Sequence, residues 1–354
     1  MGILYPLKGI IYLNAWAIVY YIGQALPQPQ FGNDNSSHAF HVSNIHSLFL
    51  GTNGANEEQM VSFIIVNYNT SALVHECAAS IRRYCTAEPF EIVVVDNASR
   101  PEEQERLKDL AADDCLLVMS RFNAGFGLGN MLGANVAKGD YLCFINSDAF
   151  LVEDCIHPLC EYLREHADVG CVTPQQVNGE GKPVYSHNHR DCIGNIFFSR
   201  NLYDTICGKN YPRRDDFSHT VPFFVQDING CFMLFPTKTF FEIGGFDTNI
   251  FLYREEYDVG CRLRNAGYKC VVHPQYKFVH LRGSSTGDSH KQTSCETQMG
   301  KIYVYSKHHG LLLSLLYKYL LILTHTLPDP KRWYQLPILL SPSPMSKSMR
   351  HKKR

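Results

Sequence analysis

Four mainly apolar runs, separated by helix-like stretches, constrain the fold more than any other feature of this sequence. The runs occupy 62–68, 91–99, 115–119 and 141–145, and helices are expected at 71–84, 101–112 and 125–138. Strands that are apolar on both faces are typical of parallel sheets covered by helices on both sides. We therefore predict an α/β fold with a mostly parallel central sheet flanked by helices.

The rest of the chain divides around this core. The expected parts are an apolar N-terminal segment at 1–26, a polar linker at 27–58, the α/β domain at 59–308, and an apolar helix with a basic tail at 309–354. Within the domain, the pattern weakens after about residue 174. It recovers with a predicted strand at 230–235, a helix at 255–268 and a strand pair at 270–281.

Both apolar ends allow two interpretations. Residues 9–26 are either a membrane-spanning or anchoring segment or a helix packed on the domain, because their length matches only the shortest spans. Residues 311–327 precede the tail KSMRHKKR, and an apolar helix with a polybasic tail suits an anionic membrane surface. The alternative at this end is a helix that covers the domain.

Charge and cysteine content narrow the class of protein. A net charge of −1 argues against a nucleic-acid binder, which usually carries a clear basic excess. The thirteen cysteines are odd in number, and no two have the C-x2-C spacing of a zinc site. Cys143, Cys231 and Cys261 lie in apolar or helical patterns, so we expect buried, reduced thiols in an intracellular protein.

Two carboxylates stand where strands of the predicted sheet end. Asp96 follows the residues IVVV, and Asp148 follows CFINS. Open α/β sheets bind ligands at the carboxyl ends of their strands. Since packing gains nothing from a carboxylate there, we interpret Asp148 as a metal ligand that holds a phosphorylated substrate.

The usual nucleotide-binding motifs do not fit this sequence. A dinucleotide site needs G-x-G-x-x-G directly after the first strand, where the chain has NTSALVHE. The Gly-rich run at 123–133 follows a later strand and carries Asn130 in place of the third glycine, and no Walker motif occurs. Transfer from a sugar nucleotide remains. It requires Mg²⁺ or Mn²⁺ at the diphosphate and a general base at the acceptor hydroxyl.

Four motifs in this order resemble those of inverting family 2 glycosyltransferases with a GT-A fold. They are IIVNYN at 64–69, VVVDNAS at 93–99, NAGFGLGNMLGANVAKGDYLCFINSD at 123–148 and GGFDTNIFLYREEYDVGCRLRNAGY at 244–268. The resemblance spans about residues 61–305. It is closest to the rhamnosyltransferases and galactofuranosyltransferases that build bacterial surface polysaccharide.

The resemblance implies a nucleotide-sugar pocket along the strand ends. Asp96 corresponds to the acid that hydrogen-bonds a uracil or thymine base, and capping the following turn is its alternative role. Asn123 and Gly125 match the N-x-G-F segment of the pocket, with Arg121 near the phosphates. The full set of expected donor-binding residues is Asn67, Asp96, Asn97, Arg121, Asn123, Gly125, Asn146 and Ser147.

The resemblance also implies a metal site made of Asp148 and His280. Asn146-Ser147-Asp148 stands where the family has D-x-D or N-x-D, so Asn146 replaces the first acid. His280 matches a histidine after the last strand. Arg282 and Ser284 would then contact phosphate oxygens.

The segment REEYD matches the family's E-D-x-D and places three acids at a helix start, where the helix dipole favours carboxylates. We expect Glu256 to be the general base, with Glu255 as its partner in the acid pair. Asp258 would support the site or hold acceptor hydroxyls, and Asp227 is expected near the acceptor sugar. Three acids this close should raise one another's pKa.

These expectations describe a metal-dependent inverting glycosyltransferase that uses a dTDP- or UDP-sugar, with rhamnose favoured. The apolar ends favour a lipid-linked precursor of surface polysaccharide as acceptor, and a location in the cytoplasm at the inner face of the cell membrane. A catalytically weak or inert nucleotide-sugar-binding homologue is the alternative, because Asn146 replaces an acid. A nucleotidyltransferase is disfavoured, since NYNTSALV lacks the required Gly-rich basic loop.

Overall fold

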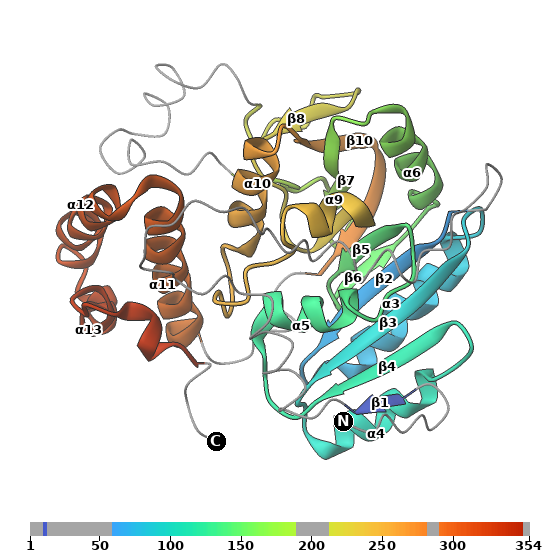
Figure 1. Cartoon of the computed structure of the whole chain (residues 1–354), viewed down its shortest axis with the longest axis horizontal. Helices are drawn as coiled ribbons and strands as arrows, with labels where there is room; N and C mark the ends of the chain where they lie inside the picture. Colours follow the sequence, from blue (N-terminus) through green and yellow to red (C-terminus); the bar gives the residue numbers. More distant parts are fainter. Residues whose placement is uncertain (1–9, 13–58, 189–211, 282–289, 350–354) are drawn as a thin grey trace, which may run out of the picture.

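A ten-stranded sheet forms the centre of the protein (Figure 1). This computed structural model describes residues 10–12, 59–188, 212–281 and 290–349. The strand order is β1-β4-β3-β2-β5-β9-β7-β10-β6, with β8 paired to β10. The strands are β1 Ile10–Tyr12, β2 Val61–Asn67, β3 Phe90–Asn97, β4 Cys115–Ser120, β5 Tyr141–Ile145, β6 Ala149–Leu151, β7 Val169–Val177, β8 Phe223–Val225, β9 Phe232–Pro236 and β10 Lys269–His280.

The predicted parallel sheet is confirmed in the first half of the domain. Strands β4, β3, β2 and β5 run parallel to one another, in this order in the sheet. The second half is mixed, because β9 pairs antiparallel with both β5 and β7. The strand pair expected at 270–281 is one long strand, β10, whose register against β7 shifts between His273 and Lys277.

Helices cover both faces of the sheet, as the doubly apolar strands predict. Alternate residues of β2 face opposite ways: Phe63 and Ile65 join one core, and Ile64 joins the other. Helices α3 (Ser71–Tyr84) and α6 (Ile156–Glu165) contribute to the first core. The second core contains side chains of α5 (Gly125–Ala134), α9 (Thr237–Glu242) and α10 (Glu255–Asn265).

Two helices end earlier than the sequence pattern indicates. Helix α5 stops at Ala134 rather than 138, and α10 stops at Asn265 rather than 268. Gly267, at a φ of +87°, ends α10 in the left-handed conformation that glycine adopts without strain. The acidic helix predicted at 101–112 is α4 (Pro101–Leu107) followed by a 3₁₀ turn at Lys108–Leu110.

The C-terminal helices form a unit beside the sheet (Figure 1). They are α11 (His290–His309), α12 (Leu311–Leu321) with the π-helical turn η2 (Ile322–Thr326), η3 (Pro330–Gln335), α13 (Leu336–Leu339) and η4 (Pro344–Lys347). A small separate core joins α11 to α12, α13 and η2, and contains Ile302, Tyr305 and Tyr317. Among the described residues, no helix is long and apolar enough to cross a membrane.

The N-terminal expectation falls mostly outside the described residues. Of the segment 9–26, only Ile10–Tyr12 is described, and it forms a strand parallel to β4 rather than a helix. The cysteine prediction is confirmed: the eleven cysteines of the described residues are free thiols, and Cys143, Cys231 and Cys261 are buried.

Candidate functional site

Asn67 and Asp96 end neighbouring strands at the edge where the predicted pocket lies. They stand opposite each other in the register of β2 and β3, and Asn67 Nδ2 donates to Asp96 Oδ1 (2.9 Å). Asp96 Oδ2 accepts from the backbone N–H of Ser99 (3.1 Å) and from Gln104 Nε2 (2.8 Å). The carboxylate therefore caps the turn after β3, which was its alternative role. Its contact with a base stays a prediction.

Asn97 fastens the N-x-G-F segment to the end of β3. Its Oδ1 accepts from Ala124 N (2.7 Å), and its Nδ2 donates to Asn123 Oδ1 (3.1 Å) and to the Gly125 carbonyl (3.0 Å). Gly125 has a φ of +79°, and a Cβ there would lie 2.1 Å from the carbonyl oxygen of Phe251. The segment thus touches the chain that leads into α10.

Asp148 and His280 lie together because β6, which starts directly after Asp148, pairs antiparallel with the end of β10. The distance from His280 Nε2 to Asp148 Oδ1 is 3.2 Å. Asp148 is buried, and within the described residues neither carboxylate oxygen has a hydrogen-bond partner. We take the 3.2 Å contact as an electrostatic one, because its geometry does not make a hydrogen bond.

This pair fits the predicted Mg²⁺ or Mn²⁺ site. Bonds of about 2.1 Å at right angles place two cis ligands about 3 Å apart, close to the separation of Asp148 and His280. No group of three or more potential His, Cys, Asp or Glu ligands occurs among the described residues. Two protein ligands suffice for Mg²⁺, which usually keeps several waters.

Gln176, which the sequence analysis missed, orients His280. It is fully buried on β7, and its Nε2 lies 3.0 Å from His280 Nδ1. Burial lowers the pKa of His280, but Cys231 and Asp148 outweigh it and raise that pKa to about 10. A metal-bound imidazole must be neutral, so a cation at Asp148 would displace this proton. Nothing in the local sequence around TPQQV marks Gln176, since its role depends on the pairing of β7 with β10.

The backbone before α10 is strained, and it positions the acid pair Glu255 and Glu256 at the start of the helix. Tyr253 and Arg254 have φ angles of +68° and +88°, which bulky residues rarely adopt. Glu255 is buried, with Oε1 lacking a hydrogen-bond partner among the described residues. Burial, then the neighbouring Glu256, raises the pKa of Glu255 well above its ordinary value. Glu256 is half-buried and accepts from Arg254 N (3.2 Å).

The expectation that all three acids raise one another's pKa is confirmed for Glu255 and wrong for Asp258. Although burial alone would raise the pKa of Asp258, the surrounding His308, Arg262 and Lys307 lower it strongly. Arg262 lies 2.7 Å from its carboxylate, Lys307 2.8 Å and His308 2.7 Å. Asp258 therefore ties α10 to α11, and an acceptor-binding role stays a prediction. Lys307 and His308 come from a helix whose packing the sequence did not indicate.

Asp227 packs on the helix that carries the acid pair, and its predicted place near the acceptor stays a prediction. It packs on α10 at Gly260, where a Cβ would lie 3.0 Å from Asp227 Cβ. Asn188 Nδ2 donates to its Oδ1 (3.0 Å), and Oδ2 has no hydrogen-bond partner among the described residues. Burial, with a smaller contribution from Glu256, raises the pKa of Asp227 to about 7.

The remaining predicted residues are less constrained. Arg121 is exposed, Asn146 is half-buried, and Ser147 Oγ lies 3.1 Å from Thr70 Oγ1. Arg282 and Ser284 lie outside the described residues.

Comparisons with known proteins agree with this geometry. The profile described as "Glycosyl transferase family 2" matches residues 62–235. The chain is similar to the rhamnosyltransferase WbbL of Escherichia coli (strain K12), with 24% identity over 228 residues, 62% of this chain and 83% of that protein. It is 31% identical over 84 residues to the N-acetylglucosaminyl-diphospho-decaprenol L-rhamnosyltransferase of Mycobacterium tuberculosis (strain ATCC 25618 / H37Rv), 23% of this chain and 27% of that protein.

Other relatives are much longer than the matched region. The glycosyltransferase GlyA of Streptococcus pneumoniae serotype 4 is 26% identical over 155 residues, which cover 42% of this chain and 22% of GlyA. Among solved structures, the crystal structure of GalNAc-T7 with UDP, GalNAc and Mn²⁺ has a TM-score of 0.51 at 15% identity, covering 83% of this chain and 57% of that one. This likeness confirms the predicted GT-A class of fold.

Proposed function

Residues 62–235 belong to glycosyl transferase family 2, and from this premise we propose that the protein transfers a sugar from a dTDP- or UDP-sugar to a glycan hydroxyl with inversion. The observation that carries the proposal is the buried Asp148–His280 pair at the strand ends, whose carboxylate oxygens lack hydrogen bonds among the described residues. Such a carboxylate needs a cation beside it, and a metal ion would take over this role from the proton of His280. Rhamnose is the favoured sugar, because two of the relatives are named rhamnosyltransferases.

Each group in the site has one proposed task. Glu256, the more accessible of the two glutamates, accepts the proton of the attacking hydroxyl. Glu255 stays protonated and holds the start of α10 against α5, where Gly127 leaves room for its side chain. Asp227 orients the acceptor sugar. Asp148 and His280 would hold Mg²⁺ or Mn²⁺, which neutralises the departing nucleoside diphosphate.

The donor is held by the strand ends. In the proposal, Asp96, Asn97 and Asn67 line the base and ribose side of the pocket, and Asn123 and Gly125 present the N-x-G-F segment to the sugar nucleotide. Arg121, Asn146 and Ser147 lie toward the phosphates. The tight packing of Gly125 on Phe251 keeps this segment in register with α10.

The relatives support a proposal for the acceptor and the location. We propose a lipid-linked glycan as acceptor, because the Mycobacterium tuberculosis relative is named for a decaprenol-linked substrate. Such an acceptor places the protein at the inner face of the cell membrane, in peripheral contact with it.

The test is release of nucleoside diphosphate from a panel of dTDP- and UDP-sugars with Mg²⁺, Mn²⁺ or chelator. We expect metal-dependent turnover of one donor, lost in Asp148→Asn and retained in Asp113→Asn, an exposed control. Binding of Mn²⁺, followed by electron paramagnetic resonance, should weaken in Asp148→Asn and in His280→Gln. Nucleotide binding without turnover of any donor would favour an inert binding homologue, as Asn146 in place of an acid allows. Failure to bind either nucleotide would overturn the proposal.

A further inference from the structure

The outward face of α12 and η2 is apolar. Leu312, Leu316, Tyr319 and Leu323 recur at helical spacing and are 84%, 46%, 56% and 61% exposed. Ten of the sixteen large exposed apolar residues in the described parts of the chain lie within 311–340. Since a surface helix normally turns polar residues outward, this face has the character of an interaction surface.

The polar residues of α12 point the other way. Ser314 Oγ donates to the carbonyl of Ile302 (2.9 Å). Lys318, the single charged residue of 311–323, is buried, and its Nζ donates to the carbonyl of Ser341 (3.0 Å). Burying an ammonium while leucines are exposed is unfavourable in water. This orientation is favourable if the outer medium is itself apolar.

The charge of this unit identifies the partner. Residues 311–354 contain eight Lys or Arg and one Asp, a net charge of +7, whereas the whole chain carries −1. Lys331 and Arg332 are exposed beside Trp333, which is 52% exposed. Tryptophan and basic residues at the edge of an apolar face are typical of the interface of a membrane with anionic lipids.

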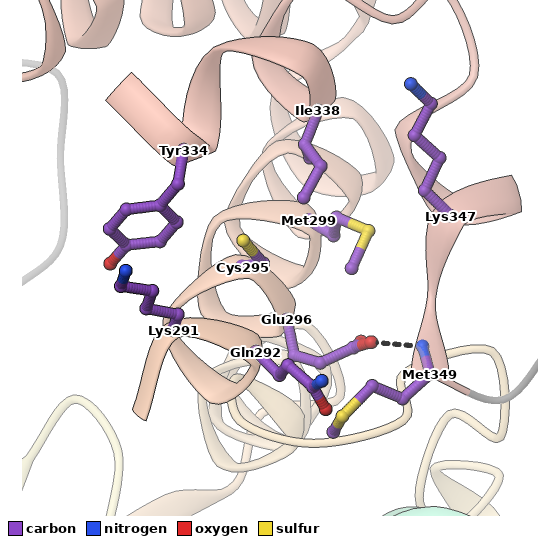
Figure 2. Close-up of a pocket in the computed structure, with 9 residues that line it drawn as sticks. All are labelled: Lys291, Gln292, Cys295, Glu296, Met299, Tyr334, Ile338, Lys347 and Met349. Carbon is purple, nitrogen blue, oxygen red and sulfur yellow. Dashed lines mark hydrogen bonds between the residues drawn. The ribbon is translucent and has the colours of Figure 1, made fainter. Parts of the chain in front are cut away.

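The chain at Ser348 and Met349 is fixed to the same unit. Glu296 of α11 is buried and accepts from Ser348 Oγ (3.1 Å) and from Met349 N. Figure 2 shows the contact between Glu296 and Met349. These residues line a cavity of about 130 Å³, and Lys291 and Lys347 are also among its lining residues. Lys347 Nζ donates to the carbonyl of Pro337 (3.0 Å), so this basic residue belongs to the same unit as the apolar face. In the sequence, RHKKR follows Met349.

We propose that the face formed by Leu312, Leu316, Tyr319 and Leu323 docks on an anionic lipid membrane, with α12 in the plane of the interface. Eleven residues are too few to span a bilayer, which takes about 20. A second copy of the chain would bring another +7, and residues 9–26 carry no charge, so neither supplies the anions that this unit attracts. The inference specifies the membrane contact of the proposed function and does not depend on sugar transfer.

The experiment is co-sedimentation of the full chain with vesicles of phosphatidylcholine alone or mixed in equal parts with phosphatidylglycerol. Leu312→Gln/Leu316→Gln is compared with Phe217→Gln/Val221→Gln, which changes exposed apolar residues elsewhere. We expect preference for the anionic vesicles, weakened by salt. Affinity should fall at least about tenfold in the α12 variant and stay within about twofold in the control.

Three outcomes would overturn the proposal: no binding to either vesicle, equal binding by the α12 variant and wild type, or a dimer in light scattering that the α12 variant dissociates without any vesicle binding. Thermal unfolding checks that both variants fold. Nucleotide release, measured on the same samples without vesicles, should be unchanged. Vesicle binding without nucleotide release from any donor would count against the proposed function alone.

Discussion

At the start of α10, two adjacent glutamates meet different surroundings. Glu255 is buried beside Gly127 of α5, and burial together with the neighbouring Glu256 raises its pKa well above the ordinary value. Glu256 is half-buried and accepts a hydrogen bond from Arg254 N (3.2 Å). Neighbouring carboxyl groups in different environments commonly have separate tasks in catalysis. In the proposed function, the difference separates a base from a packing residue.

Replacing each glutamate by glutamine tests this assignment. Glu256→Gln removes the proton acceptor, and we expect the rate of nucleoside-diphosphate release in the presence of acceptor to fall by about 10²-fold or more. Glu255→Gln replaces a protonated carboxyl by a neutral isostere, so the rate should change by less than about tenfold. Steady-state kinetics with saturating donor measures both. An active Glu256→Gln enzyme combined with an inactive Glu255→Gln enzyme would reverse the roles.

Asp227 should make stability depend on pH. Its pKa is about 7 in the folded protein against an ordinary 3.8, because burial disfavours the charged form. The unfolded chain therefore releases this proton first, and the stabilisation present below pH 3.8 is lost as pH rises toward 7. Asp227→Asn removes this loss, so the variant should gain free energy of unfolding relative to wild type between pH 5 and pH 8, by up to a few kcal/mol.

Urea unfolding at the two pH values measures this effect. Asp113→Asn, at an exposed aspartate, is the matched control, and it should leave the pH dependence of wild type unchanged. If Asp227→Asn lost stability equally at both pH values, the carboxyl would be ionised and paired in the folded protein, contrary to its environment here.

At the scale of elements, the joint between the N-x-G-F segment and the chain before α10 depends on one glycine. Gly125 and Gly181 have nearly the same positive φ, +79° and +78°, so alanine costs each a similar backbone strain. Only at Gly125 would the new Cβ meet an atom, the Phe251 oxygen at 2.1 Å; at Gly181 the surroundings are open. Comparing the two alanine variants therefore separates the cost of backbone strain from the cost of the steric clash.

We expect Gly181→Ala to lower the free energy of unfolding by about 1 kcal/mol. Gly125→Ala should cost about 1–3 kcal/mol more, because the collision forces α5 and the α10 approach apart. It should also weaken binding of UDP or dTDP, measured by calorimetry, whereas Gly181→Ala should not. Equal free energies of unfolding for the two variants would show that the contact between Gly125 and Phe251 adjusts without cost.

The elements also show which parts of the fold and the candidate site can be predicted from the sequence and which cannot. Apolar runs predict β2 to β5 because each strand is buried on both faces, a property visible locally. The antiparallel insertion of β9 between β5 and β7 depends on pairing between distant segments and leaves no such signal. The candidate site divides in the same way. Asp148 and His280 come together as the strand ends imply, whereas Gln176 and the cations around Asp258 are set by tertiary contacts.

At the scale of the whole molecule, α11 connects the part of the domain that carries the candidate site to the other helices of the C-terminal unit. Lys307 bridges Asp247 (2.7 Å) and Asp258 (2.8 Å), which hold the two ends of the segment that carries the acid pair. Gly300 lets α11 approach that segment, since a Cβ there would lie 2.8 Å from the Tyr253 oxygen. On its other side, α11 packs Ile302 and Tyr305 against α12 and α13. The C-terminal unit is thus continuous with the site's supporting structure.

Deleting each end of the chain should therefore have unequal effects. Among the described residues, removal of 1–58 takes from β4 the three register pairs that it makes with β1, so we expect nucleotide affinity to stay within about twofold of wild type. Removal of 310–354 exposes Ile302 and Tyr305 and should lower the free energy of unfolding by about 3 kcal/mol or more. Urea unfolding and calorimetry with UDP or dTDP measure both. If the 1–58 deletion variant folded but did not bind nucleotide, part of the binding site would lie in the N-terminal segment. If the 310–354 deletion left the free energy of unfolding unchanged, the C-terminal helices would not stabilise the domain, contrary to the packing described here.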